Sequence, residues 1–271
     1  MIRVKFPTID VIMPCYNCSQ TLARAVYSVI EQPYLGKLWL IDDVSTDESY
    51  ELAKRLYQKY PGKICIEQMP KNSGVAKTRN WGALQSNADI IAFLDADDAY
   101  EERALENAAA VFAFKAEINV LRLSLKPVNL PERYTTHPAF GKAWQYMEMT
   151  GAGNLVIKRS FFLACGGFPQ DPLFRQLGGE DGAFGLATTK LCLVGTLFNE
   201  AGVLHYCHDG MHAQRLLNAI LFNQHDESVT EEKLNEANQI TASICRRMMQ
   251  LKDCLNYPET GVLPLHIERT E

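Results

Sequence analysis

The sequence predicts an α/β fold in which a mostly parallel central sheet is flanked by helices, followed by a C-terminal helical appendage. Two observations predict it. In the first hundred or so residues, short apolar runs alternate with helical patterns, which is typical of βαβ units. From about residue 211 the pattern is helical alone. We therefore expect an α/β domain over residues 1–210, with halves 1–100 and 101–210, and a helical extension over residues 211–271.

Composition and net charge exclude several classes of protein. The chain has 271 residues, of which 47% are hydrophobic and 22% charged, and this suits a globular protein. Its formal net charge of -5 argues against a general nucleic-acid surface. The N-terminus lacks the apolar core of a signal peptide, and no run approaches the roughly 18 apolar residues of a membrane span. A cytoplasmic location is expected, and peripheral membrane contact stays open.

Four strands and three helices are predicted to alternate in the first half. The strands are expected at residues 9–13, 38–41, 64–68 and 90–94. The helices are expected after Ser19 as an N-cap, after a capping box at Ser45 to Glu48, and over Val75 to Ser86. This order predicts a parallel, Rossmann-like half-sheet. Because it lacks Gly-x-Gly-x-x-Gly and a P-loop, the corresponding nucleotide sites are not supported.

The second half is predicted to be less regular. Strands are expected where Leu121, Leu123 and Leu125 share one face, and at 154–157 and 193–198. Helices are expected at 101–115 and from Glu180 towards Lys190, with loops at 126–142 and 204–212. In the extension, an apolar stripe predicts a helix packed on its own domain or on a second subunit as a homodimer, with a membrane-surface helix as the alternative. The stripe comprises Ile240, Ile244, Met248, Leu251 and Leu255, beside Arg246, Arg247 and Lys252.

An acidic turn follows the fourth predicted strand. The apolar run Ile90 to Leu94 ends in the carboxylates Asp95, Asp97 and Asp98. Three acids so close together need full hydration, an opposing cation or shifted pKa values. Because open α/β sheets bind ligands at this end of their strands, the pattern favours a hard divalent cation, Mg²⁺ or Mn²⁺, with substrate phosphates. A solvated turn that caps the next helix is the alternative.

Five motifs follow one another along residues 8 to 210. They are Pro14 to Asn17 (Pro-x-Tyr-Asn), Asp42 to Asp47, Asn72 to Gly82, the Asp-x-Asp of Asp95 and Asp97, and the pair Glu180 and Asp181. In this order they resemble the inverting nucleotide-sugar glycosyltransferases of the GT-A fold, glycosyltransferase family 2. The resemblance implies a metal-dependent enzyme that moves one sugar, from a UDP-sugar in the favoured case, to an acceptor hydroxyl. The acceptor is a glycan, a lipid-linked glycan, a protein or a small molecule.

The resemblance also implies the residues of the donor site. Asp97 is expected to hold the metal, Asp95 to lie near the ribose and the metal, and His208 to complete the coordination, with His205 and His212 as rivals.

For the nucleotide, the resemblance implies that Asp43 accepts a hydrogen bond from the base, and that Arg79 and Lys77 face the nucleotide or its diphosphate. The base pocket is implied to be lined by Pro14, Tyr16 and Asn17.

The implied chemistry needs a base, because a hydroxyl is a poor nucleophile until its proton is removed. Asp181 is the implied general base, a role that typically contributes about 10²- to 10⁴-fold, and Glu180 is expected to orient the acceptor. One direct displacement then inverts the anomeric centre. Trp144 and Tyr146 are candidates for stacking on an acceptor sugar, with core or interface packing as the alternative.

Two departures and two rival hypotheses accompany the resemblance. Val44 stands where the family usually has glycine, so that turn must avoid positive φ or carry strain. The loop around His208 lacks the nearby Arg and Ser common in relatives. Both departures motivate a second hypothesis, a protein that binds nucleotide-sugar or glycan without turnover. Cys15 and Cys18 form a Cys-x-x-Cys typical of thioredoxin-like redox proteins, which is the remote hypothesis.

Overall fold

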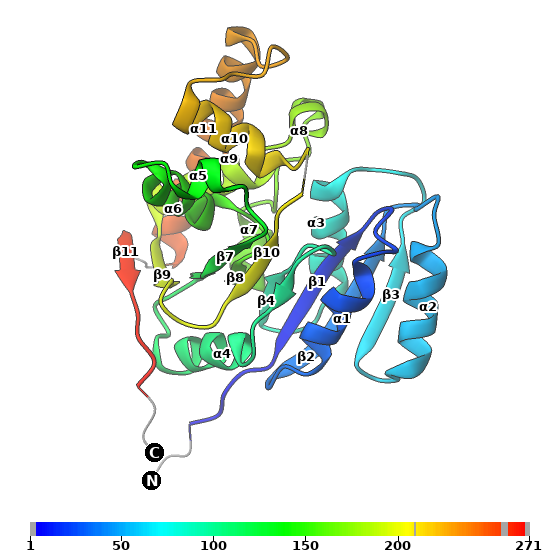
Figure 1. Cartoon of the computed structure of the whole chain (residues 1–271). Coiled ribbons are helices and arrows are strands. Elements are labelled where there is room, and N and C mark those ends of the chain that lie inside the picture. Colours follow the sequence, from blue (N-terminus) through cyan, green and yellow to red (C-terminus); the bar gives the residue numbers. More distant parts are fainter. Residues whose placement is uncertain (1–3, 209, 256–259, 269–271) are drawn as a thin grey trace.

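The computed structural model describes residues 4–208, 210–255 and 260–268, without the side chains of His212 and residues 252–255. Within these residues one sheet of eight strands runs through the molecule with helices on both faces, and a sheet of three strands lies beside it (Figure 1). Neighbouring strands of the large sheet are parallel except on either side of one strand, β8. The predicted α/β fold with a mostly parallel central sheet is confirmed.

The first half forms the predicted alternation. Its strands are β1 (Ile9–Cys15), β2 (Leu35–Asp42), β3 (Ile64–Gln68) and β4 (Ile90–Phe93). Its helices are α1 (Leu22–Ile30), α2 (Ser49–Lys59) and α3 (Val75–Gln85). The strands are parallel and lie in the order β3-β2-β1-β4. Because they point the same way, the carboxyl ends of β1, β2 and β4 meet at one edge of the sheet.

Two predicted helix starts in this half are wrong. Ser19 does not cap α1, because this helix begins at Leu22 and its N-cap position is Thr21. The N–H of Ser19 donates to Asp47 Oδ2 at 3.2 Å. The capping box from Ser45 to Glu48 does not form, because α2 begins only at Ser49, whose N–H donates to Asp47 Oδ1 at 2.9 Å. Asp47 thus ties the loop after β1 to the loop after β2.

The second half completes both sheets. The large sheet adds β6 (Val120–Leu123), β8 (Leu155–Lys158), β9 (Leu193–Leu197) and β11 (Gly261–Pro264), in the full order β11-β9-β6-β8-β4-β1-β2-β3. The small sheet contains β5 (Ala99–Tyr100), β10 (Val203–Tyr206) and β7 (Leu125–Val128). The helices are α4 (Ala104–Phe114), α5 (Glu132–Thr135), α6 (Phe140–Thr150), α7 (Arg159–Ala164), α8 (Pro172–Leu177), α9 (Glu180–Leu191), α10 (His212–Phe222) and α11 (Glu231–Leu255).

Three predictions for this half are wrong in detail. The single strand through Leu121 and Leu125 is divided between β6 and β7, which belong to different sheets. The region 126–142, predicted as loop, contains the end of β7, α5 and the start of α6. Pro127 is tolerated in β7 because this strand lies at the edge of its sheet. The predicted loop 204–212 contains most of β10.

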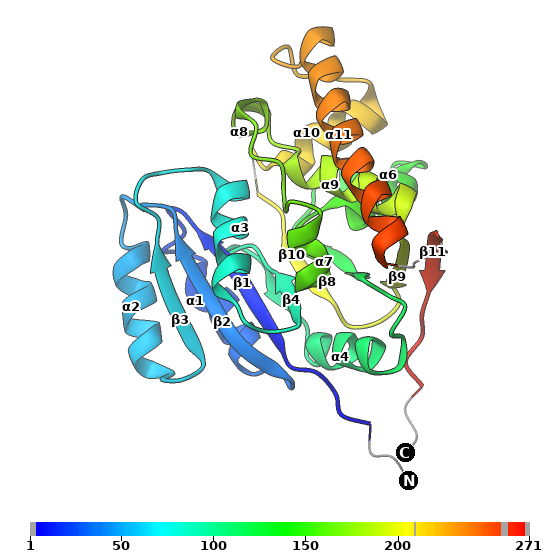
Figure 2. The ribbon, with the colours of Figure 1, turned by 180° about the vertical axis from the view of Figure 1, so that it is seen from behind.

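The core lies on both faces of the large sheet. One hydrophobic cluster contains Val11 and Met13 with residues from α1, α2, α4, α6 and α10, and the other contains Ile12 with residues from α3, α7, α8, α9 and α11 (Figure 2). Successive strand residues point to opposite faces, which explains this division. Helix α3 approaches closely at Gly82, where a Cβ would lie 2.5 Å from Ile12 Cγ2. Its buried side chains include Arg79, so it carries polar groups inward.

The chain beyond residue 210 packs on the rest of the protein. Ile244 and Met248 of the predicted apolar stripe are buried in the cluster that includes α9, so the stripe packs on its own domain (Figure 2). The side chains of Lys252 and Leu255 lie outside the described set. This segment is not helical alone, because β11 pairs in parallel with β9. Within the described residues, no helix combines the length and the apolar character that crossing a membrane requires.

Candidate active site

The acidic turn follows β4 at the carboxyl edge of the sheet, and its acids have different surroundings. Asp98 is buried, and its carboxylate binds His205 Nδ1 at 2.9 Å and accepts from Tyr206 N–H at 3.0 Å. Burial raises the pKa of Asp98 to about 6, although the hydrogen bond from His205 opposes this. Asp98 therefore anchors β10 to the acidic turn. His205 is therefore bound to Asp98 through Nδ1, whereas its buried Nε2 has no hydrogen-bond partner among the described residues.

Asp97 points to a different neighbour. Its side chain is 39% exposed, and its Oδ2 lies 3.5 Å from Nε2 of His208, which is 59% exposed. Burial and then repulsion from Asp95 raise the pKa of Asp97. The structure therefore brings together two of the three predicted metal ligands, Asp97 and His208. Among the described residues, no group of three or more His, Cys, Asp or Glu side chains is arranged to hold a metal ion.

Asp95, the third predicted ligand, is bound by Arg79. Arg79 Nη2 donates to Asp95 Oδ1 at 2.5 Å, and Nη1 donates to Glu180 Oε1 at 2.9 Å. Burial opposes the charge of Arg79, but attraction to Asp95 and Glu180 outweighs it and raises the Arg79 pKa. The structure thus places Arg79 as a buried bridge between two carboxylates, whereas the resemblance implied an arginine facing the diphosphate.

The acidic pair begins α9, and its two side chains have different partners. Gly179 before it has φ of 93°, a conformation that glycine adopts freely. Glu180 is buried against Arg79, and burial followed by repulsion from Asp181 raises its pKa to about 7. Asp181 is half-buried, and its carboxylate accepts from the N–H groups of Ala152 at 3.1 Å and Gly182 at 2.8 Å. Asp181 is therefore held by backbone amides, and Glu180 is not open to an acceptor.

The implied base pocket lies where β1 and β2 end side by side. Asp43 is buried, and its oxygens accept from the N–H groups of Ser73 at 2.7 Å and Gly74 at 2.8 Å. Tyr16 is 53% exposed beside half-buried Pro14.

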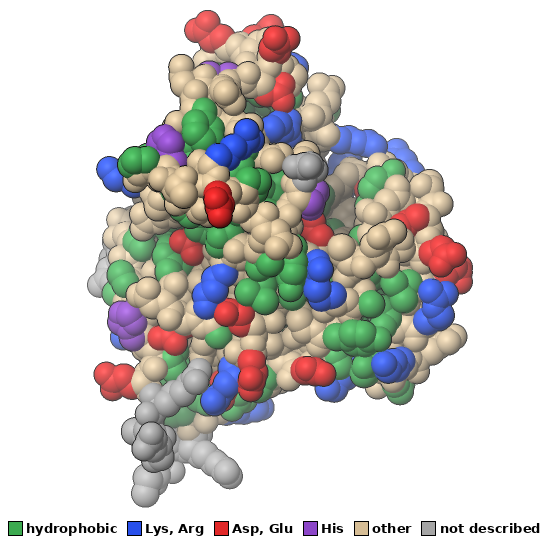
Figure 3. Space-filling model, in the orientation of Figure 1, with side chains coloured by type: hydrophobic (Ala, Val, Ile, Leu, Met, Phe, Trp, Pro, Cys, Tyr) green, Lys and Arg blue, Asp and Glu red, His purple; other side chains and the backbone are tan. Residues whose placement is uncertain are grey.

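Asn17 holds the neighbouring loop, because its Oδ1 accepts from Thr46 N–H at 2.8 Å. Lys77 is exposed on α3. Figure 3 shows this face of the molecule hollowed between the first half and the helices of the second, with acidic and histidine side chains at the wall of the hollow.

The two aromatic residues considered for stacking on an acceptor sugar differ in burial. Trp144 lies in the core and donates from Nε1 to the Leu125 carbonyl at 2.5 Å, so it does not stack on a sugar. Tyr146, on the same helix, is 38% exposed. Its pKa is raised by burial and then by the charge of Asp181.

Sequence reasoning missed three residues of the site. Arg24 donates to the Asp97 carbonyl and lies over the Tyr206 ring at 3.6 Å, so it joins α1 to the acidic turn and to β10. Gly153 packs against the acids, since a Cβ there would lie 3.2 Å from Asp95 Oδ2. Arg122, buried on β6, is attracted by Asp181. The Gly-x-Gly at 151–153 was the one sequence pattern that could have pointed to these residues. This pattern also occurs in many ordinary turns and does not by itself indicate a site.

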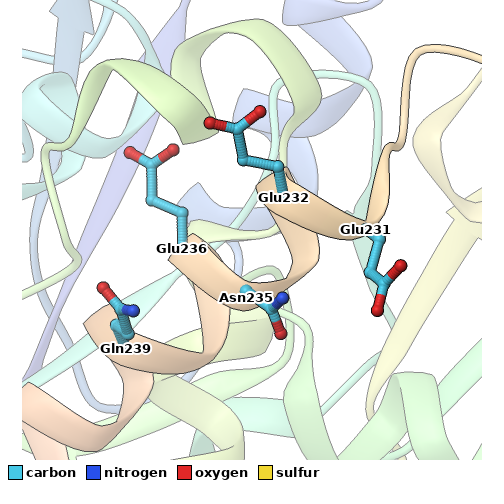
Figure 4. Close-up of a pocket in the computed structure, with 5 residues that line it drawn as sticks. All are labelled: Glu231, Glu232, Asn235, Glu236 and Gln239. Carbon is cyan, nitrogen blue, oxygen red and sulfur yellow. The ribbon is translucent and has the colours of Figure 1, made fainter.

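A depression on α11 is separate from this site. It is lined by Glu231, Glu232, Asn235, Glu236 and Gln239. Figure 4 shows the carboxylates of Glu232 and Glu236 on one side of the helix and that of Glu231 on another. None of the residues described above lines it, so it takes no part in the chemistry considered below.

The fold and the site define an α/β protein with a ligand site at the carboxyl edge of its parallel strands. A model described as "Glycosyl transferase family 2" matches residues 10–169, more than half of the chain. The chain therefore belongs to glycosyl transferase family 2. This confirms the resemblance drawn from its motifs. It also overturns the thioredoxin-like hypothesis, and Cys15 is a buried core residue at the end of β1.

The similarity to named relatives covers only part of this chain and only part of each relative. The chain is similar to the poly(ribitol-phosphate) beta-N-acetylglucosaminyltransferase TarP of Staphylococcus aureus (strain N315), with 40% identity over 103 residues, 36% of this chain and 31% of TarP. It is 36% identical over 121 residues to the minor teichoic acid biosynthesis protein GgaB of Bacillus subtilis (strain 168), covering 43% of this chain and 13% of GgaB. The chain thus spans about a third or less of these two relatives.

Solved structures extend the likeness over most of the chain. The structure of S. aureus TarS 1-349 in complex with UDP has a TM-score of 0.58 and 21% identity, and covers 90% of this chain and 72% of that one. The complex of the same protein with UDP-GlcNAc has a TM-score of 0.58, 19% identity, and coverage of 90% and 73%. At these identities the likeness concerns the fold, and it confirms the GT-A fold that the motif resemblance implied.

Proposed function

We propose that this chain is a metal-dependent inverting glycosyltransferase that moves one sugar from a nucleotide-sugar to an acceptor hydroxyl. Its family membership supports the transferase chemistry. A UDP-sugar is the favoured donor, because the similar TarS fold was solved with UDP and UDP-GlcNAc. A cell-wall glycan or other polysaccharide is the favoured acceptor class, because TarP and GgaB are named for such polymers.

One observation carries the proposal: Ala152 and Gly153, in the turn 151–154, lie against acids from two different elements of the site. The N–H of Ala152 donates to Asp181 Oδ2 at 3.1 Å, and a Cβ at Gly153 would lie 3.2 Å from Asp95 Oδ2. Asp95 of the Asp-x-Asp motif and Asp181 at the start of α9 therefore both lie against this turn. A transferase needs this arrangement to hold a diphosphate near one acid and an acceptor hydroxyl near another.

The proposed cation is Mn²⁺ or Mg²⁺. Asp97 and His208 would hold it, with Asp95 beside it and further oxygen ligands from the diphosphate, a donor set that suits these ions. The raised pKa of Asp97 fits this assignment, because a carboxylate crowded by a second acid gains from a nearby cation. When bound, the cation supplies positive charge beside the leaving diphosphate.

In the proposed reaction the acceptor oxygen attacks the anomeric carbon while the bond to the nucleoside diphosphate breaks, and the carbon inverts. Asp181 accepts the hydroxyl proton as general base. The amides of Ala152 and Gly182 hold its carboxylate in place. Glu180 would act indirectly, by holding Arg79 against Asp95.

The nucleotide residues follow the ends of β1 and β2. Asp43 is proposed to receive the base, and Lys77, exposed on α3, to approach the diphosphate. The base pocket is proposed to include Pro14, Tyr16 and Asn17. A cytoplasmic location, peripheral membrane contact, a homodimer through the C-terminal helices and the domain division at residue 210 remain predictions.

A second candidate is a protein that binds nucleotide-sugar or glycan without turnover. Val44 favours it, because this β-branched residue has φ of 61° in the loop that follows Asp43 and departs from the usual glycine. The two candidates differ in a single observable, the release of nucleoside diphosphate.

The test has two stages. Melting temperature is first measured with UDP, GDP, dTDP or CMP, with and without Mn²⁺, for wild type and Asp97→Ala. A ligand at 100 times its dissociation constant should stabilise the protein by about 2.7 kcal/mol. We expect stabilisation by UDP that requires Mn²⁺ and is lost in Asp97→Ala. No response of folded protein to any nucleotide would contradict the donor site.

Turnover is measured second, as UDP release from UDP-GlcNAc and other UDP-sugars with poly(ribitol phosphate) and other cell-wall glycans supplied as acceptors. We expect Asp181→Asn to abolish release while UDP still raises the melting temperature. Binding without release in wild type would favour the second candidate.

A further inference from the structure

Arg122 is an unusual buried cation that the proposed reaction does not use. It lies on β6 with 1% of its surface exposed. Its Nη1 donates to the Gly151 carbonyl and to Asn154 Oδ1, the latter at 3.4 Å. Among the described residues, its Nε and Nη2 have no hydrogen-bond partner. Such a group is costly to bury, and burial lowers the pKa of Arg122 to about 10.

The turn 151–154 joins Arg122 to Asp181. Arg122 binds the first and last residues of this turn, and between them the Ala152 N–H donates to Asp181 Oδ2 at 3.1 Å. Asn154 is itself fixed, since its Nδ2 donates to the Leu123 carbonyl at 2.7 Å and to the Glu148 carbonyl at 2.9 Å. The orientation of the amide that holds Asp181 therefore depends on Arg122.

The charges around Asp181 single out Arg122 as its cation. Asp181 contributes to the shifted pKa values of Arg79 from α3, Arg122 from β6, Tyr146 from α6 and Glu180 from α9. Glu180 and Tyr146 provide no positive charge. Arg79 is already paired with Asp95 and Glu180. Arg122 has no carboxylate partner within the described part of the chain, and the charge of Asp181 raises its pKa against the effect of burial.

We propose that Arg122 is a positioning residue for Asp181, which orients the turn that binds this carboxylate and keeps the carboxylate ionised and ready to accept a proton. The role rests on the proposed function of Asp181 as general base. It also accounts for a cation buried with unpaired donors, a feature that costs stability and is retained where a site requires it.

The primary test titrates Asp181 directly and needs no turnover. Protein labelled with ¹³C at aspartate carboxyl carbons is titrated by NMR, and Asp181→Asn assigns the resonance. In Arg122→Met we expect the Asp181 titration midpoint to move up by about 1 pH unit, because a neighbouring opposite charge typically moves a carboxyl by 1 to 3. Arg122→Lys, which retains the charge, should move it less. Arg159→Gln, which removes a cation from α7, is the matched control and should leave it unchanged.

The second readout is the rate of UDP release from a UDP-sugar against pH, with the same acceptors supplied. The acidic limb of the rate profile should move up in Arg122→Met by the amount found by NMR, with the UDP dissociation constant unchanged within about 2-fold. An unmoved Asp181 midpoint in folded Arg122→Met would overturn the proposal.

Arg122→Gln is the second neutral variant if Arg122→Met does not fold. Unfolding of both neutral variants would assign Arg122 a purely structural role and also overturn the proposal. If wild type binds UDP but releases none from any UDP-sugar, the proposed function fails, while the NMR titration still decides the link between Arg122 and Asp181.

Discussion

The guanidinium of Arg79 binds the carboxylate of Glu180 at 2.9 Å, although 101 residues separate them in the chain. Arg79 lies on α3 and Glu180 is the first residue of α9, so this contact joins the two halves of the protein at the candidate active site. Because Arg79 also binds Asp95, one buried side chain positions both the acidic turn and the helix that carries Asp181.

Replacement of Arg79 should therefore destabilise the protein strongly. In Arg79→Met, Glu180 would stay buried without a cation, and removal of one partner from a buried pair typically costs about 3–5 kcal/mol. We expect the free energy of unfolding at pH 8, measured with urea, to fall by about 3 kcal/mol or more. Lys77→Met, an exposed change on the same helix, is the control and should stay within about 0.5 kcal/mol. Equal effects of the two variants would contradict the bridging role.

Glu180 should give stability a distinct pH dependence. Its pKa is about 7 in the folded protein and about 4.5 when unperturbed, so between these values the folded state binds more protons and its stability falls as pH rises. Glu180→Gln cannot ionise. We expect its free energy of unfolding, relative to wild type, to increase from pH 5 to pH 7.5. The difference is measured by urea titration at each pH, and a constant difference would show that Glu180 does not titrate in this window.

Gly153 should be required for the donor site more than for folding. A Cβ at this position would lie 3.2 Å from Asp95 Oδ2 and 3.6 Å from Asp98 Oδ2. We expect Gly153→Ala to raise the dissociation constant for UDP with Mn²⁺ by about 10-fold, as crowding costs on the order of 1–3 kcal/mol. Calorimetric titration measures it. Gly141→Ala, at which a Cβ meets no atom within 4 Å, is the matched control. Equal UDP affinity in both variants would place the nucleotide elsewhere.

Val44 should carry removable strain. Its φ of 61° is unfavourable for a β-branched side chain and costs on the order of 1–3 kcal/mol. Relief of this strain in a glycine variant is partly offset, by roughly 0.5–1 kcal/mol, because glycine has more conformational freedom in the unfolded chain. We expect Val44→Gly to raise the free energy of unfolding by about 1 kcal/mol, whereas Val44→Ala, which keeps a Cβ, should gain less. A destabilised Val44→Gly would show that the side chain contributes contacts that exceed the strain.

Much of the fold could be predicted because its signals are local. The run Ile90 to Leu94 reads as a buried strand, and the alternation before it predicts the parallel half-sheet, which the structure contains. Errors arose where a local signal competed with a distant partner. Ser19 resembles an N-cap, but the loop that contains it is bound to Asp47 and the helix begins only at Leu22. Strand β11 was missed because its pairing partner, β9, lies about 70 residues earlier in the chain.

The family, the alternation of strands and helices in the first half, and the acids that end β4 and begin α9 could all be predicted, because motif spacing and apolar periodicity are properties of neighbouring residues. The order of the strands in the sheet and the partners of those acids came from the folded structure. It assigned Arg79 to Asp95 and Glu180, His205 to Asp98, and the turn 151–154 to Asp181. These contacts join separate elements across the sheet edge, and the burial that fixes their strength exists only after the chain has folded.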